Sequence, residues 1–140
     1  MAKYVYEVLE EASNAKKKED KINVLKQNES WALKDILRGS IDENIKWNMP
    51  PGEPPYTPAE AHNHPANLLR ENVKFSYFAV GGKGKDLPKF KRERLFIGLL
   101  EGVHPKDAEL VLDMINKKAP KGVTRKLVDE TFPGLLSDNK

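Results

Sequence analysis

Residues 95–115 read LFIGLLEGVHPKDAELVLDMI, and this stretch decides the fold class. The dense apolar run at 95–100 has the length and flanks of a buried helix rather than a strand. His104 and Pro105 then open another helix, because a proline is tolerated in a first turn, where its missing N–H is harmless. Gly98 costs up to about 1 kcal/mol relative to alanine in a helix, so we expect another helix backbone to come close there. The buried side of the second helix consists of Ala108, Val111, Leu112 and Ile115, with Met114 beside them.

The chain before this stretch shows helical spacing in three further segments. In residues 4–12 the apolar side chains form one stripe of an amphipathic helix, and residues 16–28 carry a shorter stripe behind a charged leader. A third apolar face begins at Trp31, with Ser30 as its N-cap and Arg38–Gly39 as its end. The N-terminal third of the chain is therefore predicted to be helical.

A proline-rich segment interrupts this pattern. Residues 49–65, MPPGEPPYTPAEAHNHP, contain six of the ten prolines and so cannot form a continuous helix or a central strand. We expect an ordered loop at about 48–65 that packs Trp47, Met49 and Tyr56 over one helical body. The alternative is a disordered linker between two domains, but neither side has enough residues for a comfortable separate core.

The two segments beside this loop are less distinctive. Residues 41–47 are compatible with one or two further helical turns. In residues 66–80 one set of apolar positions follows helical spacing and another alternates as in a strand, and we favour the helix. The glycines at 81–84 then predict a flexible turn.

The last part of the chain completes an all-α fold. Thr124 is a suitable N-cap for a helix over residues 125–131, and Pro133–Gly134 ends it. With 140 residues, 39% of them hydrophobic and none of them cysteine, the chain is long enough to bury a core without disulfides. We therefore predict a single compact all-α domain over residues 1–140, with six or seven helices and a long proline-rich loop.

No pattern in the sequence indicates catalysis. His62, Asn63 and His64 spell HNH, but an HNH nuclease site spreads these residues over a ββα element, and a metal pair would need further ligands. The acidic residues alternate with lysines as on solvated helix faces, and phosphate-loop, G-x-S-x-G and H-E-x-x-H motifs are missing. No apolar run approaches the roughly 20 residues that span a bilayer. We predict a non-enzymatic protein with no metal, cofactor, small-molecule substrate or membrane partner.

Positive charge is concentrated in two places, although the net charge is only +3. Six basic residues face two acidic ones within residues 81–94, and five face none within residues 116–126. Solvated helix ends and loops are one explanation, and a single polyanion-binding face formed by both segments is the other. The candidate phosphate ligands are Lys83, Lys85, Lys89, Lys91, Arg92, Lys117, Lys118, Lys121, Arg125 and Lys126.

Residues 119–136, APKGVTRKLVDETFPGLL, place Gly122 and Thr124 at the start of a helix. Such a start offers unpaired N–H groups and the positive end of the helix dipole, and a glycine before it lets a phosphate approach closely. The same residues have a packing explanation, in which Thr124 caps the helix while Phe132 and Leu135 fill the core. Both interpretations hold together if the helix start faces outward.

Two resemblances extend this interpretation. The run RERLFIGLLEGVHPKDAELVLDMINKK, followed by KGVTRKLVDETFPGLL, is very similar to a family of small uncharacterised proteins of myoviruses, notably those infecting marine bacteria. The match includes LKDILRGSIDENIKWNMPPGEPPY. Residues 6–26, 37–39, 45–47 and 110–136 also resemble the N-terminal DNA-binding domain of T-even-type phage ATP-dependent DNA ligases, whereas residues 50–91 do not.

The ligase resemblance implies an all-α module that grips duplex DNA through its backbone. Gly122, Thr124, Arg125 and Lys126 match the positions that would support the duplex, while Lys121 and the basic residues of 83–94 are added from their charge alone. The chain has no K-x-D-G nucleotidyl-transfer motif and is too short for the adenylation and OB-fold domains. The resemblance therefore implies the binding domain of a ligase without its enzyme.

We thus expect a non-catalytic phage DNA-binding module that contacts the phosphates of duplex or branched DNA and is accessory to replication, repair or transcription. Its partners would be DNA and phage replication or transcription proteins, in the cytoplasm of the infected bacterial host. The alternative is a protein-interaction adaptor on the same helical scaffold. It would use the MPPGEPPYTP segment, because proline-rich segments bind aromatic grooves at low ordering cost.

Overall fold

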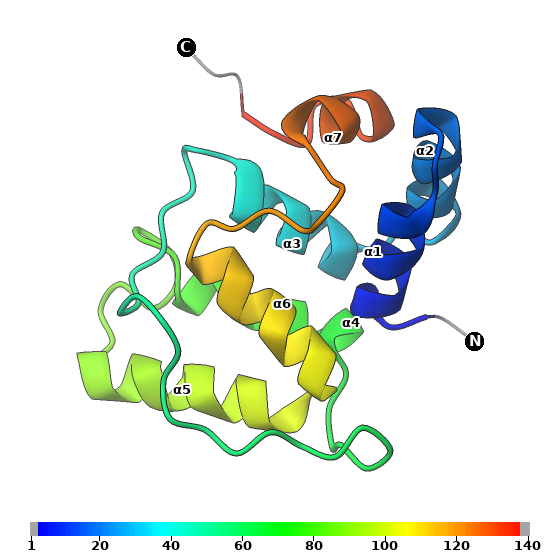
Figure 1. The fold of residues 1–140 in the computed structure, drawn as a ribbon. Helices are drawn as coiled ribbons and strands as arrows, with labels where there is room; N and C mark the ends of the chain where they lie inside the picture. Colours follow the sequence, from blue (N-terminus) through cyan, green and yellow to red (C-terminus); the bar gives the residue numbers. More distant parts are fainter. Residues whose placement is uncertain (1–2, 138–140) are drawn as a thin grey trace.

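The computed structural model describes residues 3–137, and every regular element in that range is a helix (Figure 1). The all-α prediction is confirmed, as is the expectation of six or seven helices. The only strand-like pairings in this range are two isolated bridges, Trp47 with Ala79 and Glu60 with Asn63. The elements are α1 (Val5–Asn14), α2 (Lys18–Gln27), α3 (Trp31–Ile41), α4 (Leu68–Glu71), the 3-10 helix η1 (Asn72–Tyr77), α5 (Lys89–Gly102), α6 (Pro105–Ile115) and α7 (Arg125–Thr131).

Helices α3 and α6 pack against each other in the middle of the molecule. Figure 1 shows α5 along one side of this pair and α7 on the opposite side, with α1 and α2 together at a third. Leu33, Ile36 and Leu37 of α3 are at most 1% exposed, whereas Trp31 at the start of the same helix is 69% exposed. Burial of each leucine or isoleucine side chain of this kind stabilises the fold by about 1.5–3 kcal/mol.

Local capping signals fix where three of the helices begin. The Ser30 side chain accepts a hydrogen bond from the backbone N–H of Leu33, and that of Thr124 accepts one from Leu127, as the sequence predicts. His104 caps α6 by accepting from the N–H of Lys106, with Pro105 in the first turn. Each cap satisfies an N–H group that has no partner inside the helix.

Helix α3 continues through Gly39 instead of ending there, and the prediction of its end was wrong. The indole N–H of Trp47 donates to the Gly39 carbonyl (2.9 Å). A Cβ on Gly39 would lie 2.6 Å from Trp47 Cζ2 and 2.7 Å from the sulfur of Met114. Glycine is thus needed at this place because a tryptophan ring and a helix meet there. Residues 42–46 contain no helical turn, contrary to the expectation for 41–47.

Gly98 does not mark the approach of another helix. It is exposed, and a Cβ built on it would meet no atom within 4 Å. Helix α5 buries Phe96, Leu99 and Leu100 on one side while Leu95 stays 42% exposed. The apolar run is therefore longer than the buried face of the helix. The expectation that a second helix approaches Gly98 was wrong because Gly98 lies outside that buried face.

The proline-rich segment lies over α5 and α6 (Figure 1). The backbone N–H of Gly52 donates to Asn116 Oδ1 (2.8 Å), and Asn116 Nδ2 donates to the Gly52 carbonyl (3.1 Å). Further along, the N–H of Thr57 donates to Glu101 (2.7 Å). Met49 and Tyr56 are partly buried against the core. Side chains from two helices therefore hold this segment in place.

Within residues 66–80 the stretch 68–77 is helical, but only one turn is α-helix before the chain tightens into η1. Phe75 and Phe78 are buried, whereas Val73 is 66% exposed. Ala79 pairs with Trp47, which ends the helical stretch with a single bridge. The helix was thus the right choice over the strand, although the sequence pattern did not distinguish α from 3-10 helix.

Candidate nucleic-acid interface

The basic loop after α6 begins with a C-terminal helix cap. The N–H of Lys118 donates to the Asp113 carbonyl (2.8 Å) and that of Lys117 to the Met114 carbonyl (3.0 Å). This pair of bonds is the Schellman arrangement, in which the residue after the cap takes a left-handed conformation. Lys117 has φ 58°, a place that glycine normally fills.

The Lys117 ammonium group explains why a lysine stands there. It donates to the carbonyl oxygens of Gly39 (2.7 Å), Asp42 (2.7 Å) and Ile45 (3.0 Å). Burial lowers the pKa of this amine, although Asp42 and Glu43 nearby favour its charged form. An ammonium has three N–H donors, and all three are used here. Lys117 thus holds the end of α3 and has no donor left for a phosphate.

The loop then turns through Gly122 towards α7. Gly122 has φ +76°, and a Cβ on it would lie 3.1 Å from Ser13 Cα and 3.2 Å from the ammonium of Lys21. Val123 is 4% exposed, whereas Gly122 and Thr124 are on the surface. The helix start therefore faces outward while the residue between them anchors the loop.

The other predicted phosphate ligands of this loop differ in how available their side chains are for a phosphate. Lys118, Lys121 and Lys126 are exposed. Arg125 is half-buried, donates to the Ser137 carbonyl and lies 3.6 Å from the Asp129 carboxylate. Its guanidinium group is thus partly committed to the C-terminal segment.

The structure adds lysines that sequence reasoning missed. Lys21 donates to the carbonyls of Ala12 (3.0 Å) and Ser13 (3.4 Å) at the end of α1 and lies beside Gly122. Lys18 forms an ion pair with Glu130, so the start of α2 lies against α7. The run Lys16–Lys18 was a visible signal, but only tertiary packing brings it to the basic loop. We call the following set the junction surface: Lys16, Lys17, Lys21, Lys118, Lys121, Gly122, Thr124 and Lys126.

The second basic segment has a different setting. Lys83, Lys85, Lys89 and Lys91 are exposed on the turn before α5 and on its first residues. Arg92 is only 8% exposed and donates to the carbonyls of Asn48 (3.0 Å) and Leu87 (3.2 Å). Arg92 thus ties α5 to two loops, and its side chain is not offered to a ligand.

The turn at 81–84 is tightly packed. A Cβ on Gly82 would collide with the carbonyl of Ser76, and one on Gly84 with that of Tyr77. These glycines let the turn lie directly on η1, which places the neighbouring lysines. The turn that the glycines predict is therefore present, and it is packed tightly against η1.

The starts of α5 and α7, which carry part of each basic segment, do not share a face. Helix α7 packs on α2, whereas α5 packs on α6. Figure 1 draws the start of α5 and the start of α7 on opposite sides of the α3–α6 pair. The basic residues at these two helix starts therefore form two separate surfaces.

His64 and His104 belong to an aromatic cluster around the start of α6, whereas His62 is exposed and lies 3.1 Å from the Glu60 carboxylate. The Tyr4 hydroxyl and His64 Nε2 are 2.9 Å apart, and the rings of His64 and His104 are 5.6 Å apart. Asp107 is fully buried, accepts from the N–H of Tyr6 (2.9 Å) and leaves its second oxygen without a hydrogen bond. Burial raises the pKa of Asp107 to about 6. Within residues 3–137, no three potential metal-ligating side chains lie together.

A family model described as a family of unknown function (DUF6433) matches residues 8–121. The chain belongs to this family. The DUF6433 match runs from within α1 through α6 and ends at Lys121, so α7 lies beyond it. A search of the curated proteins finds no match to the chain.

Among the residues that the structure describes, no helix is both long and apolar enough to cross a membrane.

Proposed function

We propose that this protein is a non-catalytic DNA-binding module that contacts the phosphate backbone through the junction surface. One observation carries the proposal: Gly122 packs against Ser13 and Lys21, so lysines from the α1–α2 turn join those around the start of α7. Exposed lysines on flexible stems suit the regularly spaced charges of a nucleic-acid backbone. Because these contacts address phosphates rather than base edges, binding would depend little on sequence.

Salt dependence is the first test. Binding of a fluorescein-labelled duplex of about 20 base pairs, followed by anisotropy, should weaken with a log-log salt slope of roughly −0.9 per phosphate neutralised. With about four such contacts, we expect a slope of about −3 to −4. The absence of any binding at about 50 mM salt would contradict the proposal.

A matched pair of variants tests the location. Replacing Lys16, Lys17, Lys121 and Lys126 by alanine should abolish most of the affinity and flatten the salt slope. The control replaces Lys83, Lys85, Lys89 and Lys91, which removes the same charge from the other side of the molecule. If both variants lose affinity equally, net charge and not the junction surface is responsible. Equal thermal stability of both variants and the parent would exclude unfolding as the cause.

The resemblance to ligase DNA-binding domains supports the same proposal and adds a setting. From it we propose that the module is an accessory protein of phage replication, repair or transcription, acting on duplex or branched DNA in the cytoplasm of the infected host. Co-purification of the tagged protein with phage DNA from infected cells would test this setting.

The alternative function, an adaptor that presents its proline-rich segment, has less support. The backbone of Gly52 and Thr57 is bound to Asn116 and Glu101, and Tyr56 is partly buried. A segment held in this way is not free to wrap around a partner, although Pro51, Pro55 and Pro58 are exposed. Replacing residues 50–58 by Gly and Ser should therefore leave DNA binding intact.

A further inference from the structure

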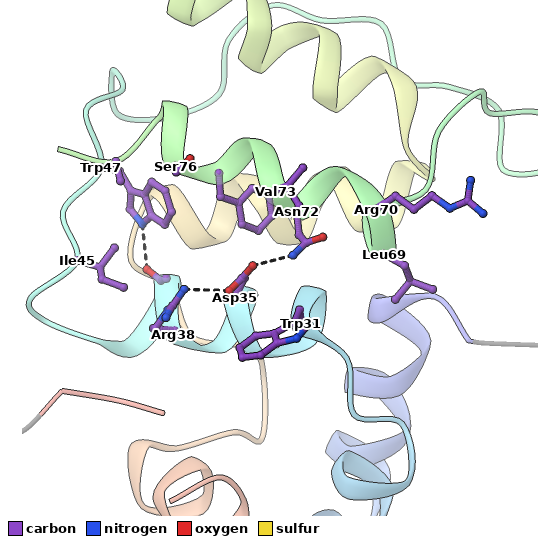
Figure 2. Close-up of a pocket in the computed structure, with 13 residues that line it drawn as sticks. Trp31, Asp35, Arg38, Ile45, Trp47, Leu69, Arg70, Asn72, Val73 and Ser76 are labelled. Atoms are coloured by element: carbon purple, nitrogen blue, oxygen red, sulfur yellow. Dashed lines mark hydrogen bonds and ion pairs between the residues drawn. The ribbon is translucent and has the colours of Figure 1, made fainter. Parts of the chain in front are cut away.

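A groove crosses the outer side of α3 and shares no residue with the junction surface. Its first hollow, of about 540 Å³, lies between α3 and η1, and Figure 2 shows the side chains that line it. A second hollow, of about 510 Å³, lies between α3 and the turn at 131–135. Trp31 and Arg38 line both hollows, and these two shared side chains join them into one surface. We call it the Trp31 groove.

The groove exposes an unusual amount of apolar surface. Trp31 is 69% exposed and Val73 is 66% exposed, and these are the two most exposed large apolar side chains among the described residues. Both line the first hollow, with Trp47, Ile45 and Leu69 nearby. A concave apolar surface with a few polar groups is the usual form of a ligand site.

One face of the Trp31 ring is open. The Lys34 ammonium lies 4.8 Å from the centre of the Trp31 ring and 5.4 Å from that of Phe132. Lys34 and Phe132 line the second hollow but not the first. The indole face towards the first hollow is therefore free of this cation and available for stacking.

Three polar groups of the first hollow, those of Asp35, Arg38 and Asn72, are already joined to one another, whereas the Ser76 hydroxyl has no hydrogen-bond partner within residues 3–137. Arg38 donates to Asp35 (3.0 Å), and Asn72 donates to the other oxygen of Asp35 (2.8 Å), as the dashed lines in Figure 2 show. The indole N–H of Trp47 already donates to the Gly39 carbonyl. Such a surface has few donors and acceptors left to read a base edge, but it can stack any flat ring.

The charge along the groove is positive. Lys34, Arg38 and Arg70 line it against Glu29 and Asp35. Glu29 pairs with Lys34 (2.7 Å) and Asp35 with Arg38 (3.0 Å), while Arg70 makes no ion pair within residues 3–137. An occupant of this groove should therefore carry negative charge.

We propose that the Trp31 groove binds an unpaired nucleotide, stacking its base on the open face of Trp31 while the cations attract its phosphates. The proposal rests on the proposed function and gives the DNA a class, namely a duplex with a single-stranded tail. An aromatic platform in a cationic groove is how single strands are bound without sequence preference. The second hollow ends at the turn after α7, whose start belongs to the junction surface. That helix rises by about 10 Å, a distance that a few nucleotides can span.

The test compares three DNA ligands by anisotropy: a blunt duplex, the same duplex with a single-stranded thymidine tail, and the thymidine oligonucleotide alone. We expect the tail to strengthen binding by about tenfold or more, in line with one stacked base. The Trp31→Ala variant should lose that gain and keep the affinity for the blunt duplex. Phe90→Ala is the matched control, because Phe90 is 59% exposed on α5, outside the groove. Tryptophan fluorescence should fall on binding the tail in the parent protein but not in Trp31→Ala.

Each other outcome is decisive. Equal binding of blunt and tailed duplex, or a gain that survives Trp31→Ala, overturns the groove proposal and leaves the proposed function standing. Binding of the thymidine oligonucleotide with Trp31-dependent quenching, but no binding of the duplex, overturns the junction surface and keeps the groove. If no ligand binds, both proposals fail, and the groove is left to an acidic segment of a protein partner.

Discussion

The ammonium of Lys117 lies 2.7 Å from the carbonyl oxygen of Gly39, across 78 residues of sequence. This contact joins the end of α6 to the last turn of α3, the two helices at the centre of the fold. The contact uses Lys117, which the basic residues around it in the sequence had led us to predict as a phosphate ligand. Some basic side chains of such a segment therefore stabilise the fold, whereas others are exposed to solvent.

Lys117→Met should destabilise the protein by about 1–3 kcal/mol, because three carbonyl groups lose a charged donor while the left-handed backbone remains. Urea unfolding measures this loss. Lys118→Met is the control, since Lys118 has the same charge and its ammonium group makes no hydrogen bond within residues 3–137. Equal stability of the two variants would show that the contacts of Lys117 contribute nothing.

Two glycines in helices should respond oppositely to alanine. At Gly39 the added methyl group would collide with Trp47 and Met114, so Gly39→Ala should lower the unfolding free energy by roughly 1–3 kcal/mol. At Gly98 the methyl group enters open space, and the better helix propensity should raise the unfolding free energy by up to about 1 kcal/mol. Thermal denaturation of both variants checks the pair. Destabilisation by Gly98→Ala would mean that α5 is covered where we find it open.

Asp107 should make stability depend on pH. Burial raises its pKa from 3.8 to about 6, so the folded protein binds the proton more tightly than the unfolded chain. The contribution of Asp107 to the unfolding free energy should therefore be greatest below about pH 4 and should be lost as the pH rises through 6. A shift of this size corresponds to at most about 3 kcal/mol.

Asp107→Asn isolates that effect from the neighbouring His64, His104 and Glu7. The variant keeps an acceptor for the Tyr6 N–H but carries no charge. The difference in unfolding free energy between variant and parent should grow in favour of the variant between pH 4 and pH 7. A difference that stays constant across this range would show that Asp107 does not titrate there.

Removal of the Thr124 cap should weaken α7. Thr124→Ala removes the acceptor for the Leu127 N–H and should cost about 0.5–2 kcal/mol, whereas Thr124→Ser should cost little. Hydrogen exchange of the first amides of α7 would follow the loss. If alanine and serine behave alike at this position, the hydroxyl does not cap the helix.

The sequence determined the elements whose causes are local. Three helix starts could be predicted from Ser30, Thr124 and the His104–Pro105 step, because each capping side chain accepts a hydrogen bond from an N–H only two or three residues away. The amphipathic stripe of α1 likewise predicts its buried side, since side chains three or four residues apart share one face of a helix. These features could be derived without knowing any neighbour in space.

The tertiary structure decided what depends on residues far apart in the chain. Only folding brings Trp47 to Gly39, Lys117 to the end of α3 and Lys21 to Gly122. It also separates the start of α5 from the start of α7, whose basic residues the sequence allowed to share a face, and opens a groove around Trp31. Charge and apolarity are properties of single residues, but their availability depends on which distant groups pack against them, and the linear order does not contain that information.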